Sequence, residues 1–485
     1  MKQLKDLLQN IKCVEVRGGN TEQEVTALHY DSRMVERGSL FFAIVGEVAD
    51  GHNYISTATQ RGAVAVVCQH LPDVIDPQVC YIVVEESSLA MGDIASAFYD
   101  NPSTELKLVG ITGTNGKTTT ATLLYDLFTK LGYKVGLIST VVYKIGAESI
   151  DSTHTTPDAI RLSQMMRRMV DEGCELCFME VSSHAIAQHR TQGLSFDGAI
   201  FSNITHDHLD YHKTFSEYIK VKKQLFDSLD RGAFALTNID DRNGRVMLQN
   251  CKAKCVSYSL RSMADFRAKV VEMHVDGMLL KLDSEEVWVK FIGRFNVYNI
   301  LAAYATARLL GVDKDEVLVA LSMLHSVSGR FEYMTTPAGT TIIVDYAHTP
   351  DALENVLTTI EEIRHEGQDL YVVCGCGGDR DHDKRPKMAA IAAKYATLSI
   401  FTSDNPRSED PESILDDMIS GVRGSSARYL RITDRAEAIK AAVIFSKGGD
   451  IILIAGKGHE TYQIIGTQRH HFDDREVARA AVENL

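Results

Sequence analysis

The stretch from residue 108 to residue 120 constrains the fold more than any other part of this chain. It reads Leu-Val-Gly-Ile-Thr-Gly-Thr-Asn-Gly-Lys-Thr-Thr-Thr, an apolar run that ends in glycines and is followed by Lys117, Thr118 and an apolar-periodic segment over 121–131. This order predicts a strand, a phosphate-binding loop and a helix, with Lys117 as a point charge and the Thr118 hydroxyl available to a phosphate-bound Mg²⁺. The Walker spacing is not met, because Ile111 stands where that motif needs glycine. A plain strand-to-helix turn is the alternative.

Length and composition indicate an ordinary soluble protein of several domains. The 485 residues correspond to about three domains at ~150 residues each, and the hydrophobic content of 45% and charged content of 24% are typical of globular proteins. No apolar run reaches the ~18 residues of a membrane helix, and the N-terminus lacks a signal-peptide core, so we expect a cytoplasmic protein. The net charge of -14 argues against a nucleic-acid partner.

The nine cysteines are an odd number, and several lie inside apolar runs. We expect buried free thiols at Cys68, Cys80, Cys177 and Cys374. Cys374-Gly375-Cys376 could form half of a zinc site, but no second close pair is near in sequence.

Short apolar runs predict the α/β organisation along the chain. Runs at 63–68 and 81–84 alternate with a helical segment at 89–99, which predicts a small α/β domain before Asn101-Pro102. Within it, Asp31-Ser32 reads by chemistry alone as a cap or Asx-turn. Further on, Asn296 and Asn299 lie three residues apart before a strongly apolar helix at 300–310, where Asn is commonly a cap.

Polar residues follow two buried-strand patterns of the central part. Glu180 comes directly after the run at 174–179, and His206-Asp207-His208 follows the run at 196–205. Ligands of open α/β sheets bind beyond the carboxyl ends of the strands, so Glu180 and one of these histidines should lie near the phosphates held by Lys117. A carboxylate and an imidazole suit a Mg²⁺ that keeps some of its waters. The alternative is a surface glutamate with helix-capping neighbours.

Lys222 is the unusual residue of a helical pattern at 216–229. At ~100° per residue it lies within about 20° of the centre of the apolar face, whereas Lys223 falls about 100° further round and Lys220 nearly opposite. An unpaired buried ammonium is costly, so Lys222 must find a partner, extend to solvent or lose its charge. A lysine of lowered pKa can react with CO₂ to give a carbamate, but helix geometry alone favours this no more than snorkelling.

From about residue 336 the pattern restarts with four strands that each end in a polar loop. The strands are predicted at 341–344, 370–373, 398–401 and 450–455, and the loops after them begin at Asp345, Gly375, Asp404 and Gly456. Several such loops at one edge are the usual way in which a doubly wound sheet builds a site.

Taken together, these residues resemble the Mur ligases, ATP-dependent amide-forming enzymes of peptidoglycan synthesis, and in particular those members that add meso-diaminopimelate. The resemblance covers essentially the whole chain, and the family's loop has the Gly-Thr-Asn-Gly-Lys-Thr form, which explains the failed Walker spacing. Its motifs here are Asp31-Ser32-Arg33 with Gly-Ser-Leu-Phe-Phe-Ala from Gly38, the loop from Gly113, Asp-Tyr-Ala-His-Thr-Pro-Asp from Asp345, and Asp404-Asn405-Pro406-Arg407.

The resemblance implies an α/β fold of three domains. Residues 1–101 would form a small UDP-sugar-binding α/β domain, 102–335 a central ATP-binding domain with a P-loop ATPase-like parallel sheet, and 336–485 a Rossmann-like amino-acid-binding domain. For ATP, the implied contacts are Gly113, Thr114, Asn115, Gly116, Lys117, Thr118 and Thr119 at the phosphates, with Asn299, Arg330 and Asp345 at adenine, phosphate and ribose.

The resemblance also implies the remaining site residues. The UDP end would contact Ser32, with Glu47, Val48 and Ala49 around the base, and the muramoyl-dipeptide would contact Thr155, Thr156, Ser182, Gln188 and Arg190. Thr118, Glu180 and His208 would hold Mg²⁺, Lys222 would be carbamylated, and Lys117, Lys222, Glu180 and His208 would be the catalytic residues. Diaminopimelate would contact Arg380, Asp404, Asn405, Arg407, Gly456 and Glu460, with the planar fork of Arg407 on its distal carboxylate.

The implied reaction activates the D-glutamyl carboxylate of UDP-N-acetylmuramoyl-L-alanyl-D-glutamate as an acyl phosphate, which an amine of diaminopimelate then attacks. ATP, Mg²⁺ and the two small-molecule substrates are the expected partners of a monomer that binds neither membrane nor nucleic acid. Two departures concern His154, where many relatives carry Asn, and the basic neighbours Lys220 and Lys223. A folylpolyglutamate-synthetase-like ligase would not need the first domain, and a regulatory nucleotide-binding module would need neither the inward Lys222 nor Asp-Asn-Pro-Arg.

Overall fold

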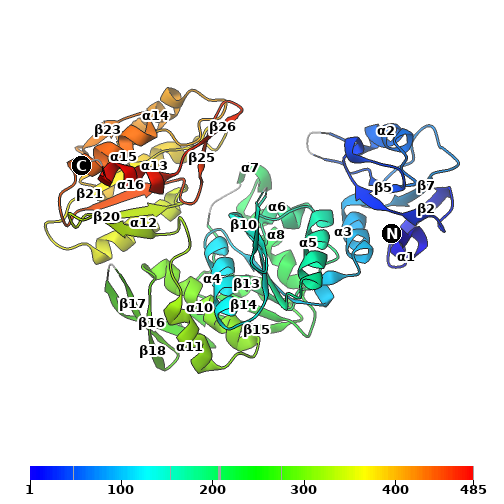
Figure 1. Cartoon of the computed structure of the whole chain (residues 1–485), viewed down its shortest axis with the longest axis horizontal. Coiled ribbons are helices and arrows are strands. Elements are labelled where there is room, and N and C mark those ends of the chain that lie inside the picture. The colour runs from blue at the N-terminus through cyan, green and yellow to red at the C-terminus, as the bar shows by residue number, and fades with distance from the viewer. Residues whose placement is uncertain (47–48, 153, 206–208, 275, 484–485) are drawn as a thin grey trace. The chain divides into compact units, whose positions relative to one another are not determined.

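We analysed a computed structural model of the chain (Figure 1), which describes residues 1–46, 49–152, 154–205, 209–274 and 276–483. The chain divides into two compact units. The first comprises Met1–Ile204 and His212–Tyr258, and the second comprises Thr205–Tyr211 and Ser259–Leu485. None of the helices in the described ranges is long and apolar enough to span a bilayer.

The first unit begins with a five-stranded sheet in the order β2-β7-β6-β5-β4. The strands β4, β5, β6 and β7 are parallel and β2 is antiparallel at the edge. Helices α1 and α3 pack on one face and α2 on the other, so the expected small α/β domain is present. Its elements are β1 (Lys2–Gln3), α1 (Leu4–Leu7), β2 (Cys13–Gly18), β3 (Glu24–Val25), β4 (Ala27–His29), η1 (Ser32–Met34), β5 (Ser39–Phe42), η2 (Gly51–Tyr54), α2 (Ile55–Gln60), β6 (Ala65–Cys68), β7 (Cys80–Val84), α3 (Ser87–Phe98) and η3 (Pro102–Thr104).

The same unit continues with a parallel sheet in the order β9-β12-β8-β13-β14-β15, to which β10 and β11 add antiparallel strands beyond β9. Helices α5 and α8 pack on one face. On the other face Phe128 of α4 lies 5.2 Å, between ring centroids, from Phe178 of β12. The elements are β8 (Lys107–Thr112), α4 (Lys117–Lys130), β9 (Val135–Ile138), β10 (Val142–Ile145), β11 (Glu148–Asp151), α5 (Ala159–Asp171), β12 (Leu176–Glu180), α6 (Ser183–Ala187), β13 (Gly198–Phe201), α8 (Phe215–Asp227), β14 (Phe234–Asn238), α9 (Gly244–Met247) and β15 (Lys254–Ser259).

The second unit contains most of the short helix α7 (Leu209–His212), three antiparallel strands with the helices that follow them, and a second parallel sheet. The three strands are β16 (Phe266–His274), β17 (Gly277–Leu282) and β18 (Glu285–Val289), and the helices are α10 (Arg294–Leu309) and α11 (Lys314–Met323). The parallel sheet has the order β19-β20-β24-β21-β22-β23, with only β19 antiparallel.

Helices cover both faces of this six-stranded sheet, which is the expected Rossmann-like arrangement (Figure 1). Alternate residues of its strands pack against α12, α13 and α14 on one face and against α15 and α16 on the other. The elements are β19 (Glu332–Thr335), β20 (Thr341–Asp345), α12 (Pro350–Ile363), β21 (Leu370–Cys374), α13 (Lys384–Tyr395), β22 (Leu398–Phe401), α14 (Pro411–Ser420), β23 (Tyr429–Arg431), α15 (Arg435–Phe445), β24 (Ile451–Ala455), the hairpin β25 (Tyr462–Ile465) and β26 (Gln468–His471), and α16 (Asp474–Glu483).

Two boundaries differ from the prediction. Glu180 is the last residue of β12 rather than the first residue after it, and α10 begins at Arg294, so it already contains Asn296 and Asn299. The N-cap of α10 is Gly293, and neither asparagine caps the helix; instead Asn299 Nδ2 donates to Asn296 Oδ1 at 3.2 Å.

The cysteine prediction is confirmed at the four named positions. Cys68, Cys80, Cys177 and Cys374 are free and buried. Cys376 Sγ lies 3.7 Å from Met388 Sδ in the core. The described part of the chain shows no metal-binding group that includes Cys374 or Cys376.

Candidate active site

The loop between β8 and α4 has the backbone of a phosphate-binding loop. Gly116 precedes α4 with a φ of 86°, in the left-handed region that favours glycine. A Cβ at Gly113 would lie 2.0 Å from Ser202 Oγ, so the loop can pass the end of β13 only with glycine there. The first N–H groups of α4 are therefore presented beyond the carboxyl edge of the sheet, where a helix N-terminus attracts anions.

Residues after β13 hold this loop in place. Ser202 Oγ and Asn203 Nδ2 both donate to the carbonyl oxygen of Asn115, at 2.6 and 3.1 Å. Asn203 Oδ1 accepts from the Asn115 N–H at 3.0 Å, and the Asn203 carbonyl accepts from the Thr114 N–H at 2.8 Å. The loop is thus held by hydrogen bonds to both the N–H and the carbonyl of Asn115.

Lys222 points into the protein, as the helix-face prediction required. Lys222, on α8, is 1% exposed. Its Nζ donates to the Gly113 carbonyl at 2.9 Å and lies 4.7 Å from the Tyr218 ring centroid. Lys220 and Lys223 pair instead with Glu217 and Asp227 of the same helix. Lys117 Nζ also donates to the Gly113 carbonyl, at 2.9 Å.

Glu180 is a buried carboxylate at the end of β12, next to β8. It is 0% exposed, and it accepts hydrogen bonds from Thr140 N at 2.7 Å and Thr140 Oγ1 at 3.1 Å. It forms no ion pair with any residue that the structure describes. A buried carboxylate with only neutral donors is costly unless a cation completes it, so Glu180 and the buried Thr118 hydroxyl fit Mg²⁺. His208, the third predicted ligand, lies outside the described residues.

The five residues assigned by resemblance to the dipeptide form one connected group. Thr156 Oγ1 donates to the Glu180 carbonyl at 2.8 Å and accepts from Ser182 N at 3.2 Å. Arg190 donates to the Thr156 carbonyl at 2.7 Å and to Gln188 Oε1 at 2.6 and 3.0 Å. Thr155 joins through Thr140 Oγ1, at 3.0 Å. The group is therefore connected to Glu180 by a continuous chain of hydrogen bonds.

The residues predicted for the UDP end lie in the first sheet's loops. Asp31 caps η1 through the Arg33 N–H, which confirms the Asx-turn interpretation, and Ser32 is buried at 7% exposure. Ala49 is exposed, and its carbonyl accepts from the Gly46 N–H at 3.0 Å. Glu47 and Val48 lie outside the described residues.

The residues predicted for adenine, phosphate and ribose belong to the second unit. Asn299 is on α10, and the Arg330 guanidinium lies 4.6 Å from the Tyr346 ring centroid. Asp345 ends β20, and its two oxygens accept from Phe331 N at 2.7 Å and Ala347 N at 2.8 Å. Burial raises the pKa of Asp345, and nearby Arg330 opposes this. That these residues and Lys117 bind one nucleotide stays a prediction.

The predicted acceptor residues gather at the carboxyl edge of the second unit's sheet. Asn405 Nδ2 donates to Glu460 Oε2 at 2.9 Å. A Cβ on Gly456 would lie 2.7 Å from Asp404 Oδ2, so this glycine leaves room beside the carboxylate. Lys457 is the charged residue that the sequence reasoning missed here, and it is 0% exposed. Its Nζ lies 3.0 Å from Asn405 Oδ1 and 3.2 Å from Glu460 Oε2.

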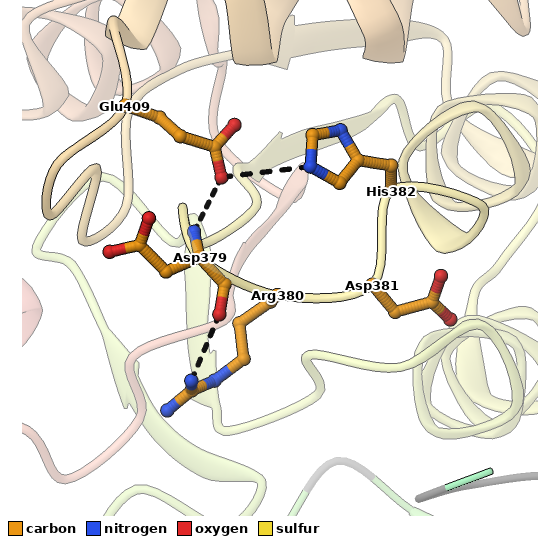
Figure 2. A pocket seen from close by; sticks show the side chains of 5 residues that line it. All are labelled: Asp379, Arg380, Asp381, His382 and Glu409. Carbon is orange, nitrogen blue, oxygen red and sulfur yellow. Dashed lines mark hydrogen bonds and ion pairs between the residues drawn. The ribbon is translucent and has the colours of Figure 1, made fainter. Parts of the chain in front are cut away.

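Arg407 and Arg380 flank the glycines after β21. Arg407 has a φ of 52° and donates to the Gly378 carbonyl at 2.6 Å. A non-glycine residue in this region is held there by its surroundings and is often functional. Arg380 donates to the Asp379 carbonyl at 3.0 Å and lines an open pocket of about 530 Å³ with Asp379, Asp381, His382 and Glu409 (Figure 2).

Buried Arg385 supports the wall of this pocket. Its guanidinium donates to Glu409 Oε1 at 2.8 Å and to Asp417 Oδ2 at 2.9 Å. The hydrogen bond from Arg385 lowers the pKa of Glu409, and Glu409 accepts from the Asp379 N–H (Figure 2). The loop that carries Arg380 is therefore tied to a buried positive charge.

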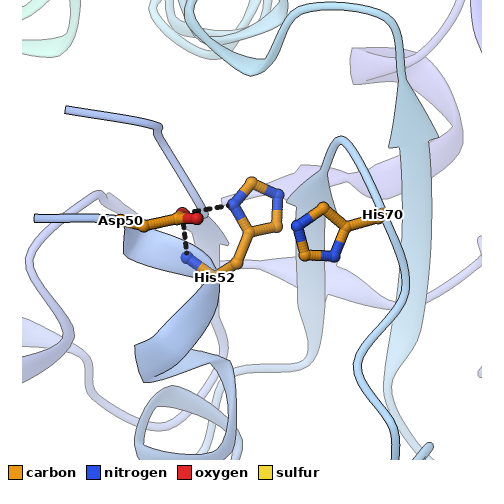
Figure 3. Close-up of side chains that lie close together, drawn as sticks. All are labelled: Asp50, His52 and His70. Carbon is orange, nitrogen blue, oxygen red and sulfur yellow. Dashed lines mark hydrogen bonds and ion pairs between the residues drawn. The ribbon is translucent and has the colours of Figure 1, made fainter.

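Asp50, His52 and His70 form a second cluster of polar side chains, in the first sheet's loops (Figure 3). Both ring nitrogens of His52 are engaged, Nδ1 with Asp50 Oδ1 at 2.7 Å and Nε2 with the Gln69 N–H at 2.9 Å. The rings of His52 and His70 stack at 4.1 Å with an interplanar angle of 19°, so their in-plane lone pairs do not converge on one point. This arrangement anchors a loop and does not fit a metal centre.

Thr140 and Lys457 were both missed, and one signal could have found them. Each follows a buried parallel strand, β9 for Thr140 and β24 for Lys457. The rule that placed Glu180 and Asp404 at the carboxyl ends of strands applies to them equally.

The chain is similar to known proteins along its whole length. Three family models match the chain. Residues 24–99 match "Mur ligase family, catalytic domain", residues 111–307 match "Mur ligase middle domain", and residues 329–458 match "Mur ligase, glutamate ligase domain". The chain is 53% identical over 485 residues to the UDP-N-acetylmuramoyl-L-alanyl-D-glutamate–2,6-diaminopimelate ligase of Cytophaga hutchinsonii, which covers 100% of this chain and 99% of the relative.

Two solved structures are also similar. One, of a UDP-N-acetylmuramoyl-L-alanyl-D-glutamate–2,6-diaminopimelate ligase, is 32% identical with a TM-score of 0.72 and covers 100% of this chain and 99% of that one. The other, Mycobacterium tuberculosis folylpolyglutamate synthase complexed with ADP and AMPPCP, shares the fold at 16% identity and a TM-score of 0.62, over 76% of this chain and 93% of that one. The full-length match at 53% identity and the three family models show that the chain belongs to the Mur ligase family.

Proposed function

We propose that this chain is an ATP-dependent ligase that adds meso-diaminopimelate to UDP-N-acetylmuramoyl-L-alanyl-D-glutamate in peptidoglycan precursor synthesis. The observation that carries the proposal is the 53% identity, over the full length of both chains, to a ligase named for this reaction. The D-glutamyl carboxylate attacks the γ-phosphate of ATP, ADP leaves, and an amine of diaminopimelate displaces inorganic phosphate from the acyl phosphate.

The ATP phosphates bind at the loop that the first unit holds rigid. Gly113, Thr114, Asn115, Gly116, Thr118 and Thr119 offer backbone and hydroxyl groups there, and Lys117 supplies positive charge to the transferring group. In the nucleotide complex we expect Lys117 to exchange its loop carbonyls for phosphate oxygens. Asn299, Arg330 and Asp345 of the second unit bind adenine, phosphate and ribose. ADP in a solved relative of the same fold supports ATP as the substrate.

Mg²⁺ would be held by Glu180, Thr118 and His208, and it would supply positive charge that neutralises phosphate charge. The buried Glu180 carboxylate, which has no cationic partner among the described residues, supports this assignment. Thr140 orients the carboxylate through both of its oxygens, so the metal finds a fixed ligand.

Lys222 is carbamylated in the working enzyme. Its burial and its place beside Lys117 on one carbonyl support the modification, because a carbamate changes a repelling positive charge into an attracting negative one. The oxygens of the carbamate can also accept hydrogen bonds or coordinate a metal ion near the transferred phosphate.

The nucleotide-sugar substrate binds along the first unit. Ser32, with Glu47, Val48 and Ala49, holds the uridine diphosphate, and the polar group of Thr155, Thr156, Ser182, Gln188 and Arg190 holds the dipeptide. The continuity of that group with Glu180 supports placing the D-glutamyl carboxylate next to the metal.

The acceptor binds at the edge of the second unit's sheet. Asp404 and Glu460 face its distal ammonium, Arg407 forms a bidentate pair with its distal carboxylate, and Arg380 pairs with the second carboxylate. Asn405 and Gly456 complete the pocket. The cluster of Asp404, Asn405 and Glu460 supports this role, since a distal amino-acid centre needs charges of both signs.

The organisation proposed with this function is three domains, 1–101, 102–335 and 336–485, in a monomeric cytoplasmic enzyme. The folylpolyglutamate-synthetase-like alternative leaves the first domain unused, whereas the match to the Cytophaga ligase includes it. The test is ADP release from the purified chain with UDP-N-acetylmuramoyl-L-alanyl-D-glutamate and each amino acid in turn. Release with meso-diaminopimelate is expected, and release only with a folate and glutamate would contradict the proposal.

A further inference from the structure

Lys457 is a buried charge to which the resemblance gives no role. It follows Gly456 at the end of β24, is 0% exposed, and lies within hydrogen-bond distance of two predicted acceptor residues, Asn405 and Glu460. Its Nζ also lies 5.6 Å from the Tyr462 ring centroid. Burying an ammonium group costs folding free energy, because the group loses its hydration, unless its charged and polar partners compensate.

One buried carboxylate, Asp404, and one partly buried carboxylate, Glu460, interact electrostatically with this lysine. Burial and the charge of Asp404 raise the pKa of Glu460, and Lys457 opposes the rise. Burial would also raise the pKa of Asp404, but Lys457 and then Arg435 outweigh it and hold that pKa below its usual value. Arg435 is already paired with Asp474. Lys457 is therefore the charge that opposes protonation of both carboxylates.

Lys457 also fixes the orientation of the Asn405 amide. Its Nζ and the Ile464 N–H both donate to Asn405 Oδ1, at 3.0 and 2.9 Å. The amide nitrogen must then face Glu460, to which it donates at 2.9 Å. Three donors thus hold Asn405 and Glu460 in one geometry.

We propose that Lys457 is a positioning residue that sets acceptor specificity. It holds Asn405 and Glu460 in place and offsets part of the negative charge of Asp404 and Glu460, so that the pocket offers acidic groups for a single ammonium next to Arg407 for a carboxylate. The acceptor class selected is an amino acid whose far end carries both an ammonium and a carboxylate. This inference rests on the proposed ligase function.

The test compares Lys457→Met and Lys457→Gln with the wild-type chain, and uses Lys447→Met, an exposed lysine of the same sheet's loops, as the control. We expect KM for meso-diaminopimelate to rise about 10- to 100-fold in both Lys457 variants, the range for losing hydrogen bonds to charged groups. KM for ATP and for the nucleotide dipeptide should stay within about twofold. The rate ratio of L-lysine to meso-diaminopimelate should rise, because the extra negative charge favours an ammonium without a carboxylate.

In a double-mutant cycle, the rise in KM for meso-diaminopimelate in the variant that combines Lys457→Met with Glu460→Gln should be smaller than the product of the two single rises. Each single variant already removes the contact between the two residues. An unchanged KM for meso-diaminopimelate, an equal rise in all three KM values, or failure of both Lys457 variants to fold would overturn the inference. Wild-type protein that releases no ADP with meso-diaminopimelate would instead overturn the proposed function.

Discussion

Lys117 and Lys222 donate to the same acceptor, the carbonyl oxygen of Gly113, each at 2.9 Å. They come from different elements, the first turn of α4 and the middle of α8. Two ammonium groups on one carbonyl repel each other, and the repulsion is strong where water is excluded. The arrangement favours removal of one charge, and Lys222 is the more buried of the two.

Carbamylation should therefore occur at Lys222 and at neither neighbour. In ¹³C-bicarbonate the native enzyme should show a carbamate carbon signal by NMR, because a buried amine in a crowded cationic site gains by becoming an anion. Lys222→Ala should remove the signal, whereas Lys220→Ala and Lys223→Ala, which break only ion pairs within α8, should keep it. A signal that survives Lys222→Ala would contradict the assignment.

Loss of Lys117 should stop the chemistry without unfolding the protein. Lys117→Ala should lower kcat by at least about 100-fold, as for other single groups that stabilise transition-state charge. Lys130→Ala, at the exposed last residue of α4, is the matched control and should turn over normally. Near-normal turnover of a folded Lys117→Ala variant would show that this lysine is not the phosphate ligand.

The pair of Arg435 and Asp474 should be the most sensitive point of the second parallel sheet. Both side chains are 0% exposed, and they form two hydrogen bonds at 2.7 and 2.8 Å. Asp474→Asn leaves Arg435 buried without its counter-charge, which should cost about 3–5 kcal/mol in the free energy of unfolding by denaturant. Glu437→Gln, which breaks an exposed pair on the same helix, should change little. Equal denaturation midpoints for Asp474→Asn and wild type would refute this.

His459 should make the protein less stable as the pH falls. Burial, then the charges of Arg330 and Arg475, lower the pKa of His459 to about 3. The unfolded chain takes up a proton at this residue below pH ~6.5, while the folded protein stays neutral there until about pH 3. The contribution of His459 to the free energy of unfolding is therefore complete above pH ~6.5. It is lost as the pH falls from there towards 3, by up to ~1.4 kcal/mol per pH unit.

Melting temperatures measured from pH 7.5 to pH 4.5 check the His459 prediction. His459→Gln should flatten the decline at low pH, because the substituted side chain does not titrate. His470→Gln, at an exposed position of β26, should leave it unchanged. Parallel curves for His459→Gln and wild type would count against the buried neutral imidazole.

Local sequence patterns were enough to predict β8, α4 and the direction of Lys222. A strand that runs into glycines and then Lys-Thr predicted β8 and α4, and the apolar face of α8 predicted that Lys222 alone points inward. These signals are local, so they need no knowledge of which strands are neighbours.

The contacts across strands could not be predicted in this way. Asn203 holds the phosphate loop because β13 pairs with β8, and Thr140 holds Glu180 because β9 pairs with β12. Strand order comes from packing of the whole domain and leaves no spacing signature. The early start of α10 was also missed, because polar residues such as Arg294 and Asn296 interrupt its apolar pattern.

Acceptor choice should depend on Arg407, whose backbone has a φ of 52° and whose side chain donates to the Gly378 carbonyl. Lysine lacks the distal carboxylate and would leave this guanidinium unpaired in a desolvated site, which is the strongest form of substrate rejection. Arg407→Ala should therefore raise KM for meso-diaminopimelate and reduce the preference over lysine, whereas Arg423→Ala, at an exposed position after α14, should do neither.

The most direct measurement is the initial rate of ADP release by the wild-type protein with UDP-N-acetylmuramoyl-L-alanyl-D-glutamate, ATP and Mg²⁺. With meso-diaminopimelate the account predicts rapid release and a tripeptide product, and with L-lysine a rate lower by at least about 100-fold. Equal rates with the two amino acids, or no release with meso-diaminopimelate, would contradict it.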